Sequence, residues 1–381
     1  MRPIYLDHNA STPIDPTVAA VMRPLLDESF GNPSSLHWAG RPAKASLETA
    51  RGKVAGLIDC VDSEVEFTSG GSEANNQAIK GVADALAGKG DHIITSAVEH
   101  PAVLAPCAFL SKRGYRITVV PVDGFGRIDP DDVRRAITPK TILISLMHAN
   151  NEVGTLQPIA EVARLARERE ILLHTDAAQS VGKIPAKVDE LGVDLMSIAG
   201  HKMYAPKGVG ALYVRSGTPL EPLVHGAGHE AGRRAGTESA LLAAALGAAA
   251  DLARDLAPMA RVRDLRDRFW TTLQSAFGEQ VRLNGHPQHR LPNTLNVSFV
   301  GRVGAEILER LDGVAASTGS ACHSGVVELS PVLKAMAVPP HVGMGAIRFS
   351  LGRNTTEAEV DAVAHRLQES LLSSAAWTRA I

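Results

Sequence analysis

Short apolar runs rich in β-branched residues alternate with amphipathic stretches of helical spacing over the first two thirds of the chain. Strands separated by helical spacers are typical of a mostly parallel sheet covered by helices on both faces. Such a sheet collects its ligands at the strand ends, so we predict an α/β architecture with a site there. The predicted strands are 64–67, 92–95, 117–120, 141–146, 171–174, 194–198 and 210–214.

The pattern changes after Thr237, where an alanine-rich helical region runs to about Phe277. Interleaved elements follow, which predict a smaller α+β domain. A chain of 381 residues also exceeds what one simple core usually supports. We therefore expect a large domain over 13–255 and a small domain built from 1–12 and 256–381, although the segment before Pro13 can pack with either part. The predicted elements of the small domain are strands near 281–283, 294–299 and 346–350 and helices near 304–311 and 357–371.

The composition of the chain argues against several classes of protein and several kinds of site. Hydrophobic residues make up 45% of the chain, which argues against disorder, and the net charge of -2 gives no electrostatic case for direct nucleic-acid or anionic-membrane contact. The apolar stretch 240–250 is too short to span a bilayer, and the N-terminus lacks a hydrophobic signal region. Cys60, Cys107 and Cys322 have neither zinc-site nor disulfide-framework spacing. We expect a cytoplasmic protein without a metal site.

Two predicted strands end in residues that suit one kind of chemistry. Lys202 follows the strand 194–198, where partial desolvation lowers the pKa of an amine and frees it to form a Schiff base. Asp176 closes the strand 171–174, where a carboxylate can pair with a pyridinium nitrogen. The pair predicts pyridoxal phosphate as the cofactor, whereas a lone lysine of this kind is usually a solvated surface residue.

Two further motifs have a functional and a plain interpretation. Gly71 and Ser72 lie where a strand passes into a helix, so backbone amides and a hydroxyl can bind a phosphate, or Ser72 can be an ordinary N-cap. His100 follows the strand 92–95 and precedes Pro101. Its imidazole can stack on a planar ring and shuttle a proton, or it can cap the helix that begins at Pro101.

Three polar residues are candidates for cofactor and substrate contacts. Asn151 and Gln179 follow strands, at places where an amide can hold a ring hydroxyl or a substrate, although asparagines in loops are often turn formers. Arg348 lies in an otherwise apolar strand. A buried guanidinium needs an anion, which is either a substrate carboxylate or the partner in an internal salt bridge.

Cys322 lies in a segment of small residues that we expect to be mobile and exposed. A thiol beside His323 can reach the thiolate form near neutral pH and act as a nucleophile. Cys60 and Cys107 fall in apolar, helix-rich settings, which favour inert buried thiols.

Together these motifs resemble the cysteine desulfurases, fold-type I pyridoxal-phosphate enzymes related to the class V aminotransferases. The resemblance covers nearly the whole chain in order, and it also rests on the segments 5–13, 31–37 and 233–238. It implies that Lys202 is the Schiff-base lysine, Asp176 the partner of the pyridine nitrogen and His100 the residue stacked on the ring. Gly71, Ser72 and His201 would lie at the phosphate, with Thr237 reaching it from the second subunit of a homodimer.

The resemblance also implies the reaction. Gln179 and Asn151 would lie at the ring hydroxyl and substrate side, Arg348 would bind the carboxylate of L-cysteine, and Cys322 would take the sulfur as a persulfide, leaving L-alanine. Lys202 would be the base. A protein acceptor would then receive the sulfur, for iron–sulfur assembly, thionucleosides or DNA phosphorothioation.

Departures from the family pattern keep alternatives open. Ala199 stands where many relatives carry serine, Ala205 where glycine is usual, and Ser72 replaces a common threonine. Ala199 and the stretch around Cys322 are similar to selenocysteine lyases and to desulfurases of DNA phosphorothioation systems, so selenocysteine lyase is the close alternative. An aminotransferase-like enzyme or a cofactor-binding scaffold without desulfuration is the alternative of a different class.

Overall fold

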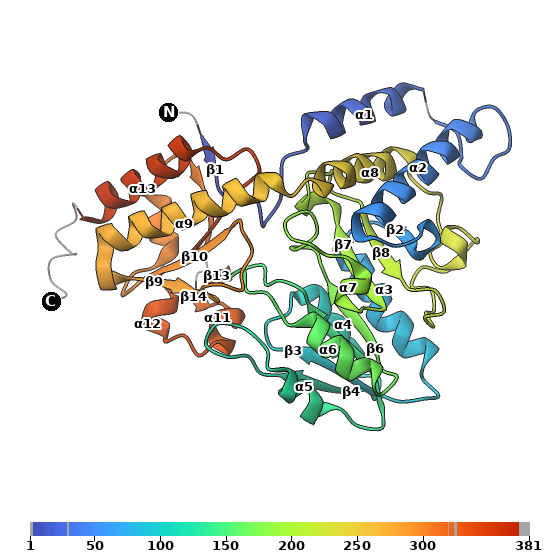
Figure 1. Ribbon diagram of the computed structural model, residues 1–381, viewed down its shortest axis with the longest axis horizontal. Helices are drawn as coiled ribbons and strands as arrows, with labels where there is room; N and C mark the ends of the chain where they lie inside the picture. The colour runs from blue at the N-terminus through green and yellow to red at the C-terminus, as the bar shows by residue number, and fades with distance from the viewer. Residues whose placement is uncertain (1–2, 29, 319, 324–325, 373–381) are drawn as a thin grey trace.

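The structure is a computed structural model that describes residues 3–28, 30–318, 320–323 and 326–372, with the side chains of 320–327 left undescribed. A larger body holds most of the first 254 residues, and a smaller body lies beside it (Figure 1). The helix α9 (Ala257–Phe277) leads from one to the other.

The larger body is built on a sheet with strand order β2-β8-β7-β6-β5-β3-β4. Every predicted strand of this region forms, and the prediction of a mostly parallel sheet is confirmed. Only β8 runs antiparallel, to both of its neighbours. The strands are β2 (Val65–Thr68), β3 (His92–Ser96), β4 (Arg116–Val120), β5 (Thr141–Met147), β6 (Leu172–Asp176), β7 (Leu195–Ala199) and β8 (Gly210–Val214).

Helices cover both faces of this sheet. Successive residues of a strand point to opposite faces, so neighbouring residues pack against different helices. Leu143 packs with α3 and α4, whereas Ile144 packs with the helices of the other face. Leu212 likewise packs on the face covered by α3 and α4, and Tyr213 packs on the other face. The helices are α1 (Pro16–Asp27), α2 (Gly40–Ile58), α3 (Gly71–Ala85), α4 (Pro101–Ser111), α5 (Pro130–Ala136), α6 (Ile159–Arg167), α7 (Val188–Leu191) and α8 (Ala240–Arg254).

The smaller body is an α+β unit, as predicted. Its sheet has the order β12-β15-β10-β9 and is antiparallel throughout. Phe269, Phe299 and Phe349 are fully buried between this sheet and the helices. The strands are β9 (Val281–Asn284), β10 (Thr294–Phe299), β12 (Ser317–Thr318) and β15 (Ala346–Ser350), and the helices besides α9 are α10 (Gly304–Glu309), α11 (Pro331–Ala335), α12 (Pro340–Gly343) and α13 (Glu357–Leu372).

The predicted alanine-rich helical region is two helices rather than one. The helix α8 ends at Arg254, because Asp255 has extended backbone (φ -80°, ψ 101°), and Asp255 Oδ1 accepts from the first amide of α9. This break coincides with the expected domain boundary at 255/256, although the division into domains stays a prediction.

The N-terminal segment contacts both bodies. The strand β1 (Ile4–Tyr5) pairs with β11 (Val314–Ala315), and Leu6 lies in the core of the smaller body. Thr12 then donates to the carbonyl of His201 in the larger body. This segment therefore crosses the junction, which brings its residues 7–12 next to the strand ends.

No helix in the described part of the chain is long and apolar enough to cross a membrane. Cys107 is buried in α4 and Cys60 is half-buried after α2. Burial raises the pKa of each thiol to about 12, as expected for inert cysteines.

Candidate functional site

A cavity of about 570 Å³ opens where β5, β6 and β7 end and the N-terminal segment crosses over them. Its volume is in the range of small-molecule sites. The cavity collects most of the residues singled out from the sequence, although their roles stay predictions. These lining residues are Gly71, Ser72, His100, Asn151, Asp176, Gln179, His201, Lys202 and Arg348.

Lys202 ends a short 3₁₀ turn, Gly200–Lys202, directly after β7. Its Nζ donates to the carbonyls of Asn9 at 2.6 Å and Ala10 at 2.8 Å. Burial, assisted by the positive charge of Arg348, lowers the pKa of Lys202 to about 8. The expected desolvation is therefore present, and a substantial share of the amine is uncharged and nucleophilic just above neutral pH.

Asp176 is the last residue of β6 and is 6% exposed. Asn75 of α3 donates to its Oδ2 at 2.7 Å, and the amide of Ala178 donates to its Oδ1 at 2.9 Å. These two hydrogen bonds fix the orientation of the carboxylate. The site can therefore offer a fixed negative charge to a protonated ring nitrogen.

The first turn of α3 forms another wall of the cavity. The N-cap is Gly70, with φ 146°, a conformation that favours glycine, so the plain interpretation of Ser72 as the N-cap is wrong. Ser72 is exposed in the first turn, beside amides that have no partner inside the helix. A side chain at Gly71 would meet Cβ of Ala199 at 3.1 Å. The turn therefore offers N–H groups and one hydroxyl to an anion.

His201 lies beside this turn. Burial and the charges of Lys202 and Lys207 lower its pKa to about 4, so its ring is neutral at pH 7. A neutral imidazole still offers one N–H donor to an anion.

The plain interpretation of His100 as a helix cap is confirmed, and its role at a planar ring stays a prediction. His100 is the N-cap of α4, since its Nδ1 accepts from the amide of Ala102 at 3.1 Å, and it also lines the cavity. That bond assigns the proton of the neutral ring to Nε2. Burial lowers the pKa of His100, which keeps the ring neutral and suited to stacking.

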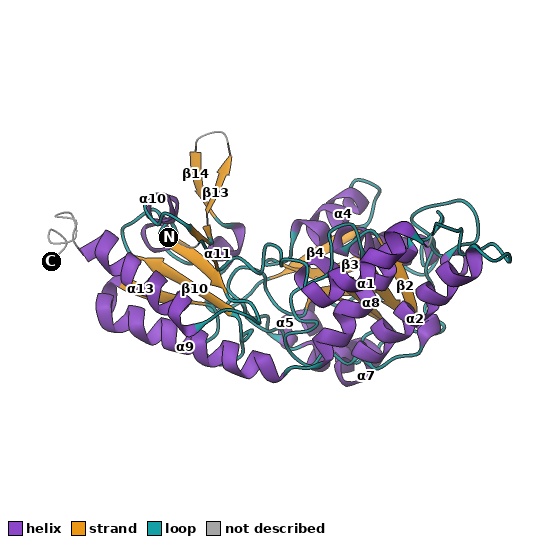
Figure 2. Ribbon diagram, turned by 90° about the horizontal axis from the view of Figure 1, so that it is seen from above, coloured by secondary structure: helices purple, strands orange, loops and turns teal. Residues whose placement is uncertain are grey.

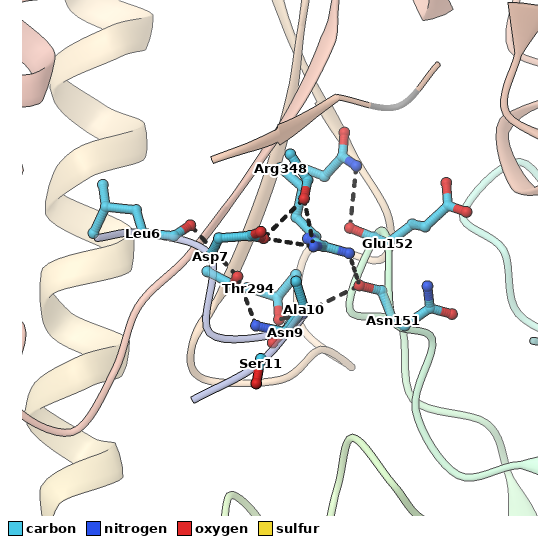
Figure 3. A network of polar contacts seen from close by, with 12 residues as sticks. Leu6, Asp7, Asn9, Ala10, Ser11, Asn151, Glu152, Thr294 and Arg348 are labelled. Atoms are coloured by element: carbon cyan, nitrogen blue, oxygen red, sulfur yellow. Dashed lines mark hydrogen bonds and ion pairs between the residues drawn. The ribbon is translucent and has the colours of Figure 1, made fainter. Parts of the chain in front are cut away.

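Arg348 has an internal anion, which confirms the salt-bridge interpretation, whereas a substrate carboxylate as its partner stays a prediction. Its guanidinium lies between Asp7 and Asn151 (Figure 3). Nη2 is 2.7 Å from Asp7 Oδ1 and 2.8 Å from Ser317 Oγ, and Nη1 donates to the carbonyl of Asn151 at 3.0 Å. Nε is buried and has no hydrogen-bond partner among the described residues. Arg348 is thus fixed at the cavity, and three of its five N–H donors are used in these contacts.

The two asparagines after β5 have different surroundings. Asn150 is a turn former, because its Oδ1 accepts from the amides of Glu152 and Val153 and its side chain is buried. Asn151 lines the cavity instead. Gln179 also lines it, and its Nε2 donates to the carbonyl of Asn9 at 2.9 Å.

Thr237 does not line this cavity, and the side chain of Cys322 lies outside the described ones. Thr237 is exposed at a neighbouring hollow, which it shares with Ser69 and Arg234. Cys322 lies in β13 (Ser320–His323), which pairs with β14 (Val326–Leu329). The two strands project from the smaller body (Figure 2). The predicted mobility and exposure of this segment stay predictions.

Sequence reasoning missed four residues that complete the site: Asn75, Asn9, Asp7 and Lys183. Asn75 had a usable signal, because it follows Ser72 by one helical turn. Asp7 and Asn9 reach the site from the N-terminal segment through long-range contacts, which no local pattern marks. Lys183 lies only four residues beyond Gln179, but no motif in the sequence marks that contact.

A protein-family model and named relatives match most of this chain. The family model "Aminotransferase class-V" matches residues 4–363. The chain is 51% identical to a protein named cysteine desulfurase IscS from Dictyoglomus turgidum, over 94% of this chain and 92% of that protein. It is 45% identical to a namesake from Methanosarcina thermophila, over 95% and 90%.

Solved structures agree with these matches. A structure titled as a NifS-like protein superposes with a TM-score of 0.91 at 36% identity, covering 97% of this chain and 99% of the other. DndA from Streptomyces lividans superposes with a TM-score of 0.77 at 37% identity, over 90% and 97%.

Proposed function

The chain belongs to the class V aminotransferase family, and from that premise we propose that it is a cysteine desulfurase that uses pyridoxal phosphate to convert L-cysteine to L-alanine. The observation that carries the proposal is the convergence of Lys202, Asp176 and Arg348 on one cavity. The identity of 51% with a protein named cysteine desulfurase supports the same activity.

The residues present fit this cofactor. Lys202 would hold its aldehyde carbon, Asp176 its ring nitrogen, and His100 its ring face. Gly71, Ser72 and His201 would hold its phosphate, and Gln179 its ring hydroxyl. When bound, the cofactor acts as an electron sink for the carbon skeleton of an amino acid.

Side chains of the protein would bind the substrate and move its protons. Arg348 and Asn151 would bind the substrate carboxylate and orient the amino acid. The lowered pKa of Lys202 leaves its amine able to accept the proton from Cα of the substrate. The neutral ring of His100, with its proton on Nε2, can donate or pass on a proton within the cavity.

Cys322 would receive the sulfur. The C–S bond of L-cysteine breaks, the sulfur becomes bonded to Cys322 as a persulfide, and the thiol proton balances the new C–H bond of alanine. The strand β12 begins at Ser317, whose hydroxyl contacts Arg348. Five residues of chain reach at most about 18 Å, which is the upper limit on the distance between Cys322 and Ser317 along the chain.

A homodimer in the cytoplasm and a protein acceptor of the sulfur are further parts of the proposal. Phe30, Leu36 and Trp38 are more than three quarters exposed, which is unusual for large apolar side chains and favours a second copy as their cover. Thr237 would then reach the phosphate site of the partner subunit.

The test is a product assay on the purified, cofactor-loaded protein. We expect alanine and sulfide in equal amounts from L-cysteine with a thiol reductant present. Faster alanine formation from L-selenocysteine with little from L-cysteine would instead favour a selenocysteine lyase. Amino-group transfer to a keto acid without sulfide would favour an aminotransferase.

A further inference from the structure

Lys183 is a second amine near the candidate site, and none of the roles above uses it. It is 8% exposed, although an unpaired buried lysine is costly. Its position follows from close packing at its neighbour: Gly182 has φ 76°, and a Cβ there would come within 2.9 Å of Cβ of Ala253 in α8. The backbone is thus pressed against α8, and Lys183 extends into the interior.

The amine of Lys183 has a specific partner there. Its Nζ donates to Oε1 of Gln179 at 3.0 Å, four residues earlier. Burial, with the charges of Lys202 and Arg348, lowers the pKa of Lys183 to about 7. Both the charged and the neutral amine keep N–H donors, so the donation to Gln179 does not depend on the charge.

The contact with Lys183 determines which atom of the Gln179 amide remains available to other groups. With Oε1 taken by Lys183, the other end of the amide, Nε2, donates to the carbonyl of Asn9 at 2.9 Å. The same carbonyl accepts from Lys202 Nζ at 2.6 Å. A primary amide nitrogen has two hydrogens, and the one not used by Asn9 is left for the cavity that Gln179 lines.

We propose that Lys183 is a positioning residue that holds Gln179 with its N–H, rather than its carbonyl oxygen, available to the cofactor. This proposal rests on the proposed function, because it assigns the group that Gln179 meets as the oxygen of the cofactor's ring hydroxyl. An oxygen that carries negative charge needs a donor, and a rotated amide would present an acceptor to it.

The consequence is a property of the bound cofactor that can be read without turnover. A donor at the ring oxygen withdraws negative charge from the neighbouring cofactor–lysine linkage and so lowers its proton affinity. In Lys183→Met the Gln179 oxygen loses its donor and the amide is free to rotate. The pH at which the visible absorption band of the holoenzyme titrates should rise by about one unit, which is a tenfold change in the protonation equilibrium.

The experiment is a spectrophotometric pH titration of the cofactor-loaded protein and its variants. Lys183→Arg keeps a donor and should titrate near the unsubstituted protein. Lys187→Met is the matched control on the same segment, because Lys187 is an exposed lysine paired with Asp59 and Glu190. If Lys183→Met does not accumulate as folded protein, Lys183→Gln replaces it, with a smaller rise expected because an amide donor remains.

A double-mutant cycle separates positioning from a general structural effect. In a Gln179→Ala background, Lys183→Met should cause no further rise, since the effect runs through Gln179. An unchanged titration in Lys183→Met, or an equal rise with and without Gln179, overturns the proposal. A preparation with no visible band in any variant overturns the proposed function itself, so the two failures are distinguishable.

Discussion

Asp7 Oδ1 lies 2.7 Å from Nη2 of Arg348, and the side chains of both residues are less than one fifth exposed. The pair joins the N-terminal segment to β15 across 341 positions of sequence (Figure 3). Arg348 is therefore neutralised and oriented by the protein before any substrate arrives. A substrate carboxylate meets a guanidinium that is already in place, which reduces the entropy cost of binding.

We expect Asp7→Asn to lower the free energy of unfolding by about 1–3 kcal/mol at pH 7, because the guanidinium then lies buried without an anion. Urea denaturation of the cofactor-free protein measures this loss. Asp27→Asn, at an exposed position, is the control. Coincident unfolding curves for Asp7→Asn and the control would show that the pair contributes nothing to stability.

Arg348→Lys should raise KM for L-cysteine about tenfold to a hundredfold, because an ammonium cannot replace the planar fork of donors. Turnover of cysteamine, which has no carboxylate, should change little by comparison. Initial rates over a substrate series give both values. An equal loss for the two substrates would contradict carboxylate recognition by Arg348.

Cys322→Ala should keep the visible cofactor band and lose sulfide release from L-cysteine, since the substitution removes the proposed sulfur acceptor and leaves every residue proposed to hold the cofactor. Absorbance spectra and a sulfide assay in the presence of a reductant test this. Cys60→Ala is the control, because burial raises the pKa of that thiol to about 12 and makes it a poor nucleophile. Sulfide release at the unsubstituted rate in Cys322→Ala would refute the persulfide role.

The pKa of Lys202, lowered to about 8, predicts the pH dependence of cofactor loading. Only the neutral amine attacks an aldehyde, and it predominates above its pKa. The rate constant for loading cofactor-free protein with pyridoxal phosphate should therefore rise from pH 6.5 and level off above about pH 9. Stopped-flow absorbance gives this profile, and a rise that continues to pH 10.5 would mean that Lys202 has an ordinary pKa.

The sequence predicted most of the sheet because buried strands are continuous apolar runs, as in 141–146, where period and length leave little choice. The break at Asp255 was missed although Pro258, in the first turn of α9, is a usable signal for a helix start. The strand around Cys322 was missed because its small residues carry no period-two alternation.

Site residues on strand ends could be found from sequence, and those that reach the site through tertiary contacts could not. Lys202 and Asp176 each follow a recognisable strand. Lys183 and Asp7 acquire their meaning only when Gln179 and Arg348 lie beside them. Ser72 and His100 show the limit of local interpretation, since each was equally compatible with a helix cap, and only His100 is one.

Lys202 is proposed to carry the cofactor, and borohydride reduction of the loaded protein is the decisive experiment. Reduction should fix one pyridoxyl group per chain, and peptide mass spectrometry should locate that group on Lys202. A label on Lys183 or another lysine, or a protein that stays colourless and unlabelled after incubation with pyridoxal phosphate, would contradict this proposal.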